Sequence, residues 1–221
     1  RGGVLSAEEL LQIGGVLKCA RQVKNYADGD SVETVLDVWF FQLMANKYLE
    51  DRIFTAIVSK DEIADAASSE LAAIRRKIRQ QSVKIRESLQ KIISSPSYAK
   101  YLQEPIITIR SDRFVVPVKS EFKNNIPGLV HDVSSSGSTF FIEPMQAVNA
   151  NNDLRELLIA ERKEIERILA ELSAQAADWR EHIETNYRVL VQLDCIFARA
   201  RLSFAMRAIE PKITEDEIIA L

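Results

Sequence analysis

The sequence has few cysteines, few of the helix-breaking residues glycine and proline, and no long apolar run. Its 221 residues include only 2 Cys, 7 Gly and 6 Pro. Cys19 and Cys195 are too few and too far apart for a disulfide framework or a zinc site, and each lies on an expected apolar helix face, which predicts buried, reduced thiols. A reducing, cytoplasmic location fits this usage best. No apolar run approaches the roughly 20 residues that a membrane helix needs, so we expect no membrane partner.

The scarcity of breakers favours a mostly helical chain. With 47% hydrophobic residues the chain can bury a core. Its formal net charge of -3 gives no general attraction to polyanions. Any contact with nucleic acid must therefore come from a local basic patch.

The exception to the helical pattern is a β-rich island from Ile106 to Pro144. Ser111-Asp112 and the loop from Ser134 to Ser138 have turn composition, and each separates two β-branched or aromatic runs, so two hairpins are expected. Pro117 lacks an amide proton and predicts that its strand is an edge or is bulged.

Two charged helices with apolar seams flank the island. The first is expected from Glu70 to Ile93, about 36 Å long, with Ile74, Ile78, Ile85 and Ile92 on its seam. The second seam follows the island and comprises Leu154, Leu158, Ile165, Ile168, Leu172 and Trp179. Joined by a sheet, the two helices should run antiparallel.

Charge supports this pairing. Residues 70–104 carry eight basic groups against three acidic ones, whereas residues 146–190 carry six against nine. A symmetric reversal predicts that the basic run is neutralised across the helix pair. A solvated ion-pair face is a commoner use of such charges than a nucleic-acid stripe. The predicted pairs are Arg75, Arg76, Lys77 and Arg79 with Glu166 and Glu171, and Lys84 with Glu161 and Glu164.

The two ends of the chain supply the body. Ser6 and Glu9 have the spacing of a capping box, so a helix should begin at Ala7 and end at Asp28-Gly29-Asp30-Ser31. Apolar residues from Val35 to Met44 predict a second helix at the centre of the core. A third helix is expected through Tyr187, Leu190, Leu193, Ile196, Phe197 and Phe204, ending at Glu210-Pro211.

Together these patterns predict a mainly α fold: a helical bundle with a long antiparallel coiled-coil arm that carries a small β-sheet tip. The expected division is a core and lever bundle from residues 1–69 and 181–221, coiled-coil arms at 70–104 and 146–180, and a β-rich clamp tip at 105–145.

Residues Gly128 to Pro144, GLVHDVSSSGSTFFIEP, closely resemble the signature of the bacterial MutS-two subfamily, paralogues of the mismatch-repair ATPase. The run from Arg113 to Lys119, RFVVPVK, resembles the strand that precedes this signature in that subfamily. Asp65-Ala66-Ala67-Ser68, followed by Leu71 and Ile74-Arg75, resembles the start of its ascending arm. Leu193-Asp194, followed by Ala198, Ala200 and Ala205, is similar to its descending lever helix. The resemblance covers nearly the whole chain.

The resemblance implies a non-catalytic core, lever and clamp region of a MutS-like ATPase. In the family such a region couples the motion of a dimeric ATPase domain to a clamp around nucleic acid or a ribonucleoprotein, in suppression of recombination or rescue of collided ribosomes. It implies branched or double-stranded DNA or the ribosome as partners, a homodimer, and ATP and Mg for a longer protein, in which a nuclease-like domain often follows the ATPase. No Gly-x-x-x-x-Gly-Lys-Ser/Thr loop occurs here, so we expect no enzyme activity and no cofactor in this stretch. The ends of the sequence suggest a piece of a larger protein.

Candidate chemical sites are few. His131, Asp132 and Ser134 invite a catalytic reading, but alternation along a strand puts His131 and Asp132 on opposite faces. His131 is expected to be a partly buried donor, and Glu143 to end its strand and cap the next helix. The best candidates for contact with nucleic acid are Lys100, Arg110, Arg113, Lys119 and Lys123. Residues 105–145 hold four basic and four acidic groups, so a patch requires the fold to sort the signs.

Two classes of function stay open. One is a moving clamp for nucleic acid or ribosomes, favoured by the island on two long arms. The other is a structural module for dimerisation or protein interaction, in which the arms mediate dimerisation; the weak basic excess and the well-formed seam favour it.

Overall fold

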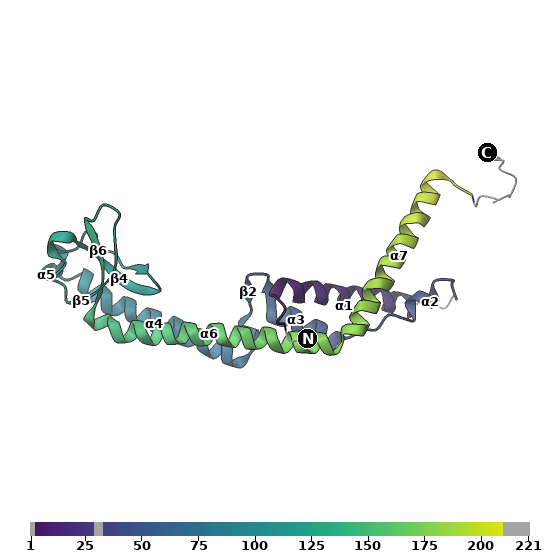
Figure 1. Cartoon of the computed structure of the whole chain (residues 1–221), viewed down its shortest axis with the longest axis horizontal. Coiled ribbons are helices and arrows are strands. Elements are labelled where there is room, and N and C mark those ends of the chain that lie inside the picture. The colour runs from purple at the N-terminus through teal and green to yellow at the C-terminus, as the bar shows by residue number, and fades with distance from the viewer. Residues whose placement is uncertain (1–2, 29–32, 210–221) are drawn as a thin grey trace. The chain divides into compact units, whose positions relative to one another are not determined.

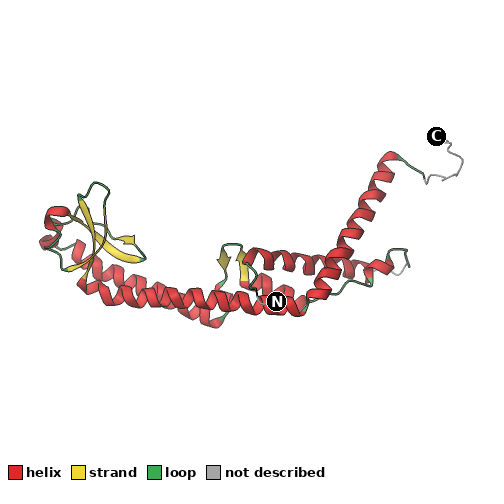
Figure 2. Cartoon of the chain, viewed as in Figure 1, coloured by secondary structure: helices red, strands yellow, loops and turns green. Residues whose placement is uncertain are grey.

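The computed structural model describes residues 3–28 and 33–209. Helices make up most of this part of the chain, with two small antiparallel sheets (Figure 2). The mainly α fold class is therefore confirmed. The chain divides into two compact units, one formed by Arg1–Phe54 and Leu172–Leu221 and the other by Thr55–Glu171. None of the helices in the described residues is long and apolar enough to cross a membrane.

The first unit begins with the predicted capping box. The amide of Ser6 donates to Glu9 Oε2 at 2.8 Å, and the amide of Glu9 donates to Ser6 Oγ at 3.3 Å, so the helix starts at Ala7 as expected. It ends at Asp28; the predicted stop at residues 29–31 and the one at Glu210-Pro211 involve residues outside the described ranges. The helices of this unit are α1 (Ala7–Asp28), α2 (Asp37–Phe40), α3 (Lys47–Ala56), the end of α6 (Met145–Asp178) and α7 (Arg180–Met206).

The second helix of the prediction is wrong in length. Only one turn, α2, forms between Val35 and Met44, and the Val35 side chain is 91% exposed. The fully buried Asn186 amide explains this difference, because it donates to the Met44 carbonyl at 2.8 Å and accepts from the Met44 amide at 2.9 Å. A side chain from α7 thus holds the backbone that helix continuation would need.

The core of this unit lies where α1 and α2 pack on α7. Its buried apolar residues are Ala20, Phe40, Leu43, Val189 and Leu193. Leu49 and Ile53 on α3, a helix that the sequence reading did not anticipate, are also buried. Cys19 and Cys195 are free but exposed, so the prediction of buried thiols is wrong. Cys19 lies between Leu17 and Ala20, which take the buried positions of α1.

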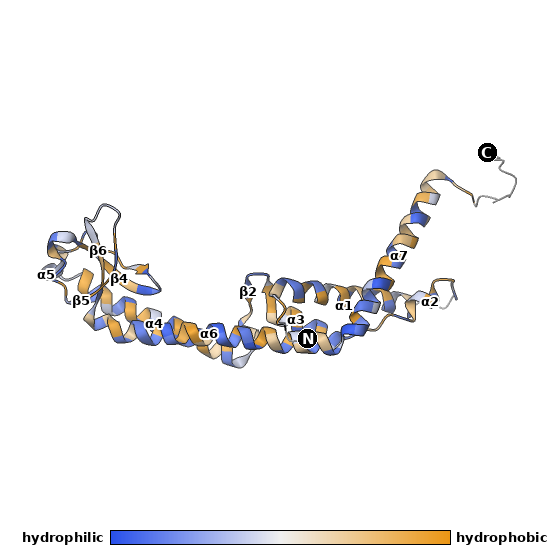
Figure 3. Ribbon diagram, in the orientation of Figure 1, coloured by the Kyte–Doolittle hydropathy of each residue, from blue (hydrophilic) through white to orange (hydrophobic). Residues whose placement is uncertain are grey.

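The second unit is built on α4 (Ser69–Ile93), which runs antiparallel to α6 (Figure 1). Side chains join the two helices along their length: Ser68 Oγ donates to Glu164, and Gln81 Nε2 to the Ala150 carbonyl. Hydrophobic and hydrophilic residues are interspersed along both helices (Figure 3), as expected for helices with one apolar seam. The predicted helix from Glu70 to Ile93 is confirmed to within one residue.

The predicted ion-pair register is wrong. Arg75 Nε donates to Glu161 Oε1 at 2.6 Å, not to Glu166 or Glu171. The reversal is asymmetric, which explains the shift. α4 ends at Ile93, and a one-turn helix, α5 (Pro96–Ala99), and a loop intervene before the sheet, whereas α6 follows the last strand directly.

The predicted four-stranded island is confirmed. Its order is β3-β4-β6-β5, all antiparallel, with β3 (Thr108–Arg110), β4 (Arg113–Lys119), β5 (Gly128–Val133) and β6 (Thr139–Pro144). Ser111 and Asp112 both have positive φ, 50° and 60°, which matches the tight hairpin turn expected there. A separate small hairpin, β1 (Ile57–Ser59) and β2 (Glu62–Ile63), precedes α4.

Pro117 does not lie on an edge strand. It is buried in β4, between β3 and β6, and faces Phe141 across the ladder with β6. Its carbonyl accepts from the Gln103 amide at 2.9 Å. Because the N–H and C=O of one residue in an antiparallel strand point to the same side, the missing donor faces this short flanking segment, and the ladder with β6 is intact.

Candidate nucleic-acid interface

The sheet is fixed to the helix pair by one apolar core. The end of α4 contributes Ile85, Leu89, Ile92 and Ile93 to this core, and α6 contributes Ala147 and Leu154. The sheet and its connections supply Leu102, Phe114, Val116, Val118, Ile126 and Ile142. A sheet of such short strands is barely stable alone, so its stability depends on packing against the two helices.

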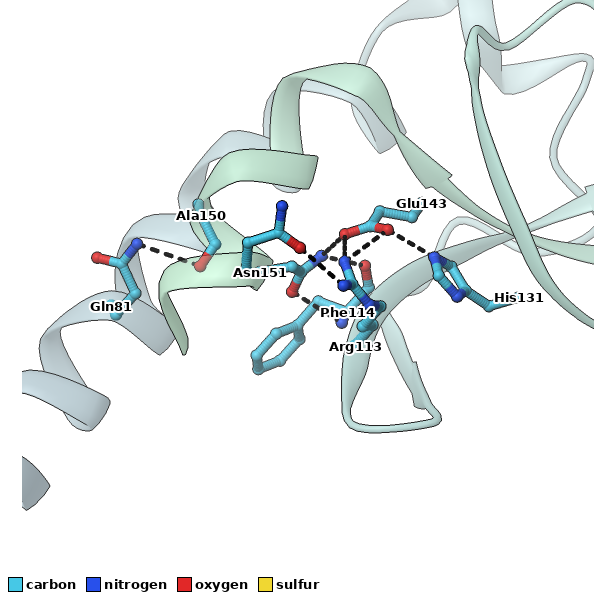
Figure 4. A network of polar contacts seen from close by, with 8 residues as sticks. Gln81, Arg113, Phe114, His131, Glu143, Ala150 and Asn151 are labelled. Atoms are coloured by element: carbon cyan, nitrogen blue, oxygen red, sulfur yellow. Dashed lines mark hydrogen bonds and ion pairs between the residues drawn. The ribbon is translucent and has the colours of Figure 1, made fainter. Parts of the chain in front are cut away.

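A buried carboxylate, Glu143, ties β4, β5 and β6 together (Figure 4). The Glu143 side chain has no exposed surface. Its Oε1 accepts from Arg113 Nη1 at 2.7 Å and from Asn151 Nδ2 at 2.8 Å, and its Oε2 lies 2.5 Å from His131 Nε2. A buried charge is costly unless it is paired and hydrogen-bonded, and this carboxylate has three partners.

Asn151 extends this network to α6. Its Oδ1 accepts from the Phe114 amide and its Nδ2 donates to the Phe114 carbonyl, both at 3.1 Å. The side-chain amide thus bonds the backbone of β4 as a neighbouring strand would. The sheet is therefore joined to α6 by directional bonds as well as by apolar packing.

Sequence reasoning missed this role of Glu143, for which it expected a helix cap. Alternation along β6 puts Glu143 on the face opposite Ile142, so no local pattern predicted its burial. A carboxylate at a strand end is more often solvated, so the sequence could not indicate burial. The expectation for His131 is confirmed: it is partly buried and bonds to Glu143, while Asp132 faces away and pairs with Arg110 at 3.2 Å.

Three of the predicted basic residues gather at one end of the sheet. Lys119 Nζ donates to the Lys100 carbonyl at 3.3 Å. Lys123 lies 5.3 Å from the centre of the Phe140 ring, and Phe140 faces Val118, next to Lys119, across the ladder. We call Lys100, Lys119 and Lys123 the tip lysines.

Aromatic rings lie among the tip lysines. Lys100 Nζ is 4.9 Å from the centre of the Tyr101 ring, which lies 5.2 Å from the Phe122 ring and 6.4 Å from the Tyr98 ring. Glu121, exposed on the turn between Lys119 and Lys123, is the acidic group closest in sequence to them. Lysines interleaved with aromatic rings suit a phosphate backbone and its bases.

The two predicted arginines have other partners. Arg113 is only 12% exposed and donates to Glu143 and, at 2.7 Å, to Asn152 Oδ1. Arg110 pairs with Asp132 and stacks 4.2 Å from the centre of the Phe141 ring. The fold thus brings Lys100, Lys119 and Lys123 together and directs Arg110 and Arg113 to contacts within the sheet.

The serine loop is a hairpin turn. Gly137 has φ of 71°, its amide donates to the Ser134 carbonyl at 2.8 Å, and Ser134 Oγ accepts from the Thr139 amide at 3.0 Å. These bonds account for the loop without a ligand. No group of His, Cys, Asp and Glu suited to a metal ion occurs in the part of the chain that is described.

The fold and this surface define a class: a mainly α chain in which a helix pair carries a small sheet with a basic and aromatic end. The comparisons name the subfamily. The chain is 46% identical over 224 residues to a protein of Acetivibrio thermocellus named endonuclease MutS2. The alignment covers 100% of this chain and 28% of that protein. Proteins of the same name from Clostridium beijerinckii and Clostridioides difficile are 47% and 45% identical, over 98% and 99% of this chain and 28% of their own length.

The resemblance to the MutS2 subfamily is therefore confirmed, and the chain corresponds to a segment of its members. It spans about 28% of the length of the relatives it matches. No family model matches the chain.

Proposed function

We propose that this chain is the core, lever and clamp region of a MutS-like ATPase, and that its tip grips the phosphate backbone of nucleic acid, as DNA or as ribosomal RNA. The single observation that carries the proposal is the cluster of tip lysines among Tyr98, Tyr101 and Phe122. Lysine supplies the charge that releases condensed counterions, and aromatic rings supply surfaces for stacking.

In this proposal α4 and α6 act as a coiled-coil arm. Residues 1–69 and 181–221 form the core and lever bundle, 70–104 and 146–180 the arms, and 105–145 the clamp tip. The buried bonds of Glu143 and Asn151 support transmission along the arm, because they fix the sheet to α6. Motion would come from an ATPase domain outside this chain, with ATP and Mg bound there in a cytoplasmic homodimer. This segment itself would not be an enzyme.

A second candidate is a structural module for dimerisation or protein interaction. Exposed apolar side chains on the last turns of α7 and just beyond it favour this alternative. Leu202 is 59% exposed, Phe204 83%, Met206 68% and Ile209 90%. A concentration of large exposed apolar side chains of this kind is a feature of interaction sites.

The test compares this 221-residue chain with its Lys100→Gln, Lys119→Gln, Lys123→Gln variant. Binding to a DNA duplex, a four-way junction and purified ribosomes is measured at several salt concentrations by fluorescence anisotropy or sedimentation. We expect the variant to bind at least one of these ligands at least about tenfold more weakly. The slope of log affinity against log salt concentration should be smaller in magnitude by about 3.

The matched control removes three exposed cations from the rest of the same unit, as Lys60→Gln, Arg155→Gln, Lys163→Gln. It loses the same charge and should bind nearly as the unchanged chain does. Unchanged binding of the tip variant to all three ligands would refute the tip proposal. A stable dimer by light scattering, without affinity for any ligand, would favour the interaction module instead.

A further inference from the structure

α4 carries a second basic surface, distinct from the tip. The helix holds seven Lys or Arg and two Glu. Three of its cations have partners: Arg75 pairs with Glu161 and Asp65, Arg79 lies 3.5 Å from Asp65, and Arg86 lies 5.0 Å from the centre of the Phe114 ring. The other four are Arg76, Lys77, Lys84 and Lys91.

These four remaining cations are all exposed, and none has an ion pair with any residue in the described ranges. The sequence reading expected acidic side chains of the second helix to neutralise Arg76, Lys77 and Lys84. That expectation is wrong, because the register brings Glu161 to Arg75 and Glu164 to Ser68 instead.

Three of the unpaired cations form a row. Lys77, Lys84 and Lys91 recur every seven residues, which is nearly two helical turns, so they lie on one stripe of α4. With a rise of about 1.5 Å per residue they are about 10.5 Å apart and span about 21 Å. The apolar seam, which includes Ile74, Ile85 and Ile92, takes a different stripe of the helix.

Acidic groups near the row leave it positive. Glu87 lies between Lys84 and Lys91 on the same helix, and Asp153 of α6 accepts from Gln81 at 3.3 Å, between Lys77 and Lys84. Neither carboxylate forms an ion pair with a lysine of the row. Glu70, seven residues before Lys77, lies at the end of the same stripe. Four cations, with Arg76, therefore face three anions.

We propose that Lys77, Lys84 and Lys91 bind the phosphate backbone of a nucleic acid that also contacts the tip, so that α4 is a second contact surface. The inference deepens the proposed function and rests on it. A rigid row of regularly spaced ammonium groups fits a polymer with regularly spaced charges. Of the large apolar side chains of α4, only Val83 is substantially exposed, at 53%, so this helix offers a protein partner little apolar surface beside the row.

The experiment uses the 221-residue chain and its Lys77→Gln, Lys84→Gln, Lys91→Gln variant, with a fluorescent duplex of about 24 base pairs. Each phosphate contact contributes about 0.9 to the magnitude of the slope of log affinity against log salt concentration. The slope of the variant should therefore be smaller in magnitude by about 2.7. Between about 50 and 200 mM salt, the unchanged chain should therefore lose about 40-fold more affinity than the variant.

Three controls separate a contact from a structural effect. Lys77→Arg, Lys84→Arg, Lys91→Arg keeps the charges and should keep the slope, and the Lys60, Arg155 and Lys163 variant should change it by less than about 1. Thermal unfolding followed by circular dichroism must match the unchanged chain. A separate competition test addresses the nature of the partner: excess poly-glutamate should displace the labelled duplex from the unchanged chain poorly.

The outcomes of the two proposals are distinguishable in the same assay. If the row variant keeps the full slope while the tip variant loses binding, the row inference is overturned and the proposed function stands. If the tip variant binds normally, the proposed function fails even where the row variant is impaired. Competition by poly-glutamate as effective as that by duplex would overturn the row inference in favour of an acidic protein partner.

Discussion

At the scale of single residues, the tip depends on positions that admit one side chain. Gly128 pairs with Pro144 at the start of β5, and a Cβ atom there would lie 2.2 Å from the Glu143 carbonyl oxygen and 2.7 Å from Ile142 Cγ2. The obstacle is backbone, which cannot rotate away. Close approach of β5 to β6 at this point therefore requires glycine.

Glu143 is the second such position. Glu143→Gln should destabilise the chain by about 3 kcal/mol or more, because it leaves the Arg113 guanidinium buried without its counter-charge. The measurement is urea unfolding of the 221-residue chain. Asp132→Asn is the matched control, since it breaks the exposed pair with Arg110 and should cost less than about 1 kcal/mol. Equal losses in the two variants would contradict a special role for the buried carboxylate.

At the scale of elements, one serine both begins a helix and joins it to its neighbour. Ser68 Oγ accepts from the Leu71 amide at 2.9 Å, which caps α4, and donates to Glu164 Oε1 at 2.6 Å. Arg167 donates to the same carboxylate at 2.7 Å and 2.8 Å. These bonds lower the pKa of Glu164 from 4.5 to about 2, and the Arg167 bonds contribute more to this shift than the Ser68 bond does.

This lowered pKa predicts a contribution to acid stability. Above pH 4.5 the ionised Glu164 carboxylate stabilises the fold, and this contribution is lost as the pH falls toward about 2, because the unfolded chain takes up the proton first. Glu164→Gln should therefore flatten the pH dependence of the unfolding free energy between these limits. Urea unfolding across this range measures it, with Glu166→Gln, an exposed neighbour, as the control. An unchanged pH dependence in Glu164→Gln would contradict the assignment.

At the scale of the whole molecule, the two units differ in how the chain builds them. Thr55–Glu171 is continuous and closes through the antiparallel pair of α4 and α6, whereas the other unit needs both ends of the chain. The continuous unit also contains its own apolar core beneath the sheet.

Residues 55–171 alone should therefore fold. We expect a cooperative thermal transition and a circular dichroism spectrum with both helix and strand, with fraying confined to the cut ends of α3 and α6. Residues 1–54 alone should not fold, because Asn186, Val189 and Leu193 of α7 complete their core. A non-cooperative transition in 55–171 would contradict the independence of this unit.

Local signals in the sequence determined the start of α1 at its capping box, the bounds of α4 and the two hairpins of the island. Each of these depends on neighbours within a few residues, such as Ser6 and Glu9 or the turn at Ser111 and Asp112. Tertiary structure alone decided the rest. Asn186 holds the backbone near Met44, the asymmetric reversal pairs Arg75 with Glu161, and side chains from β4, β5 and α6 enclose Glu143. Such outcomes depend on partners distant in sequence, whose register no local pattern encodes.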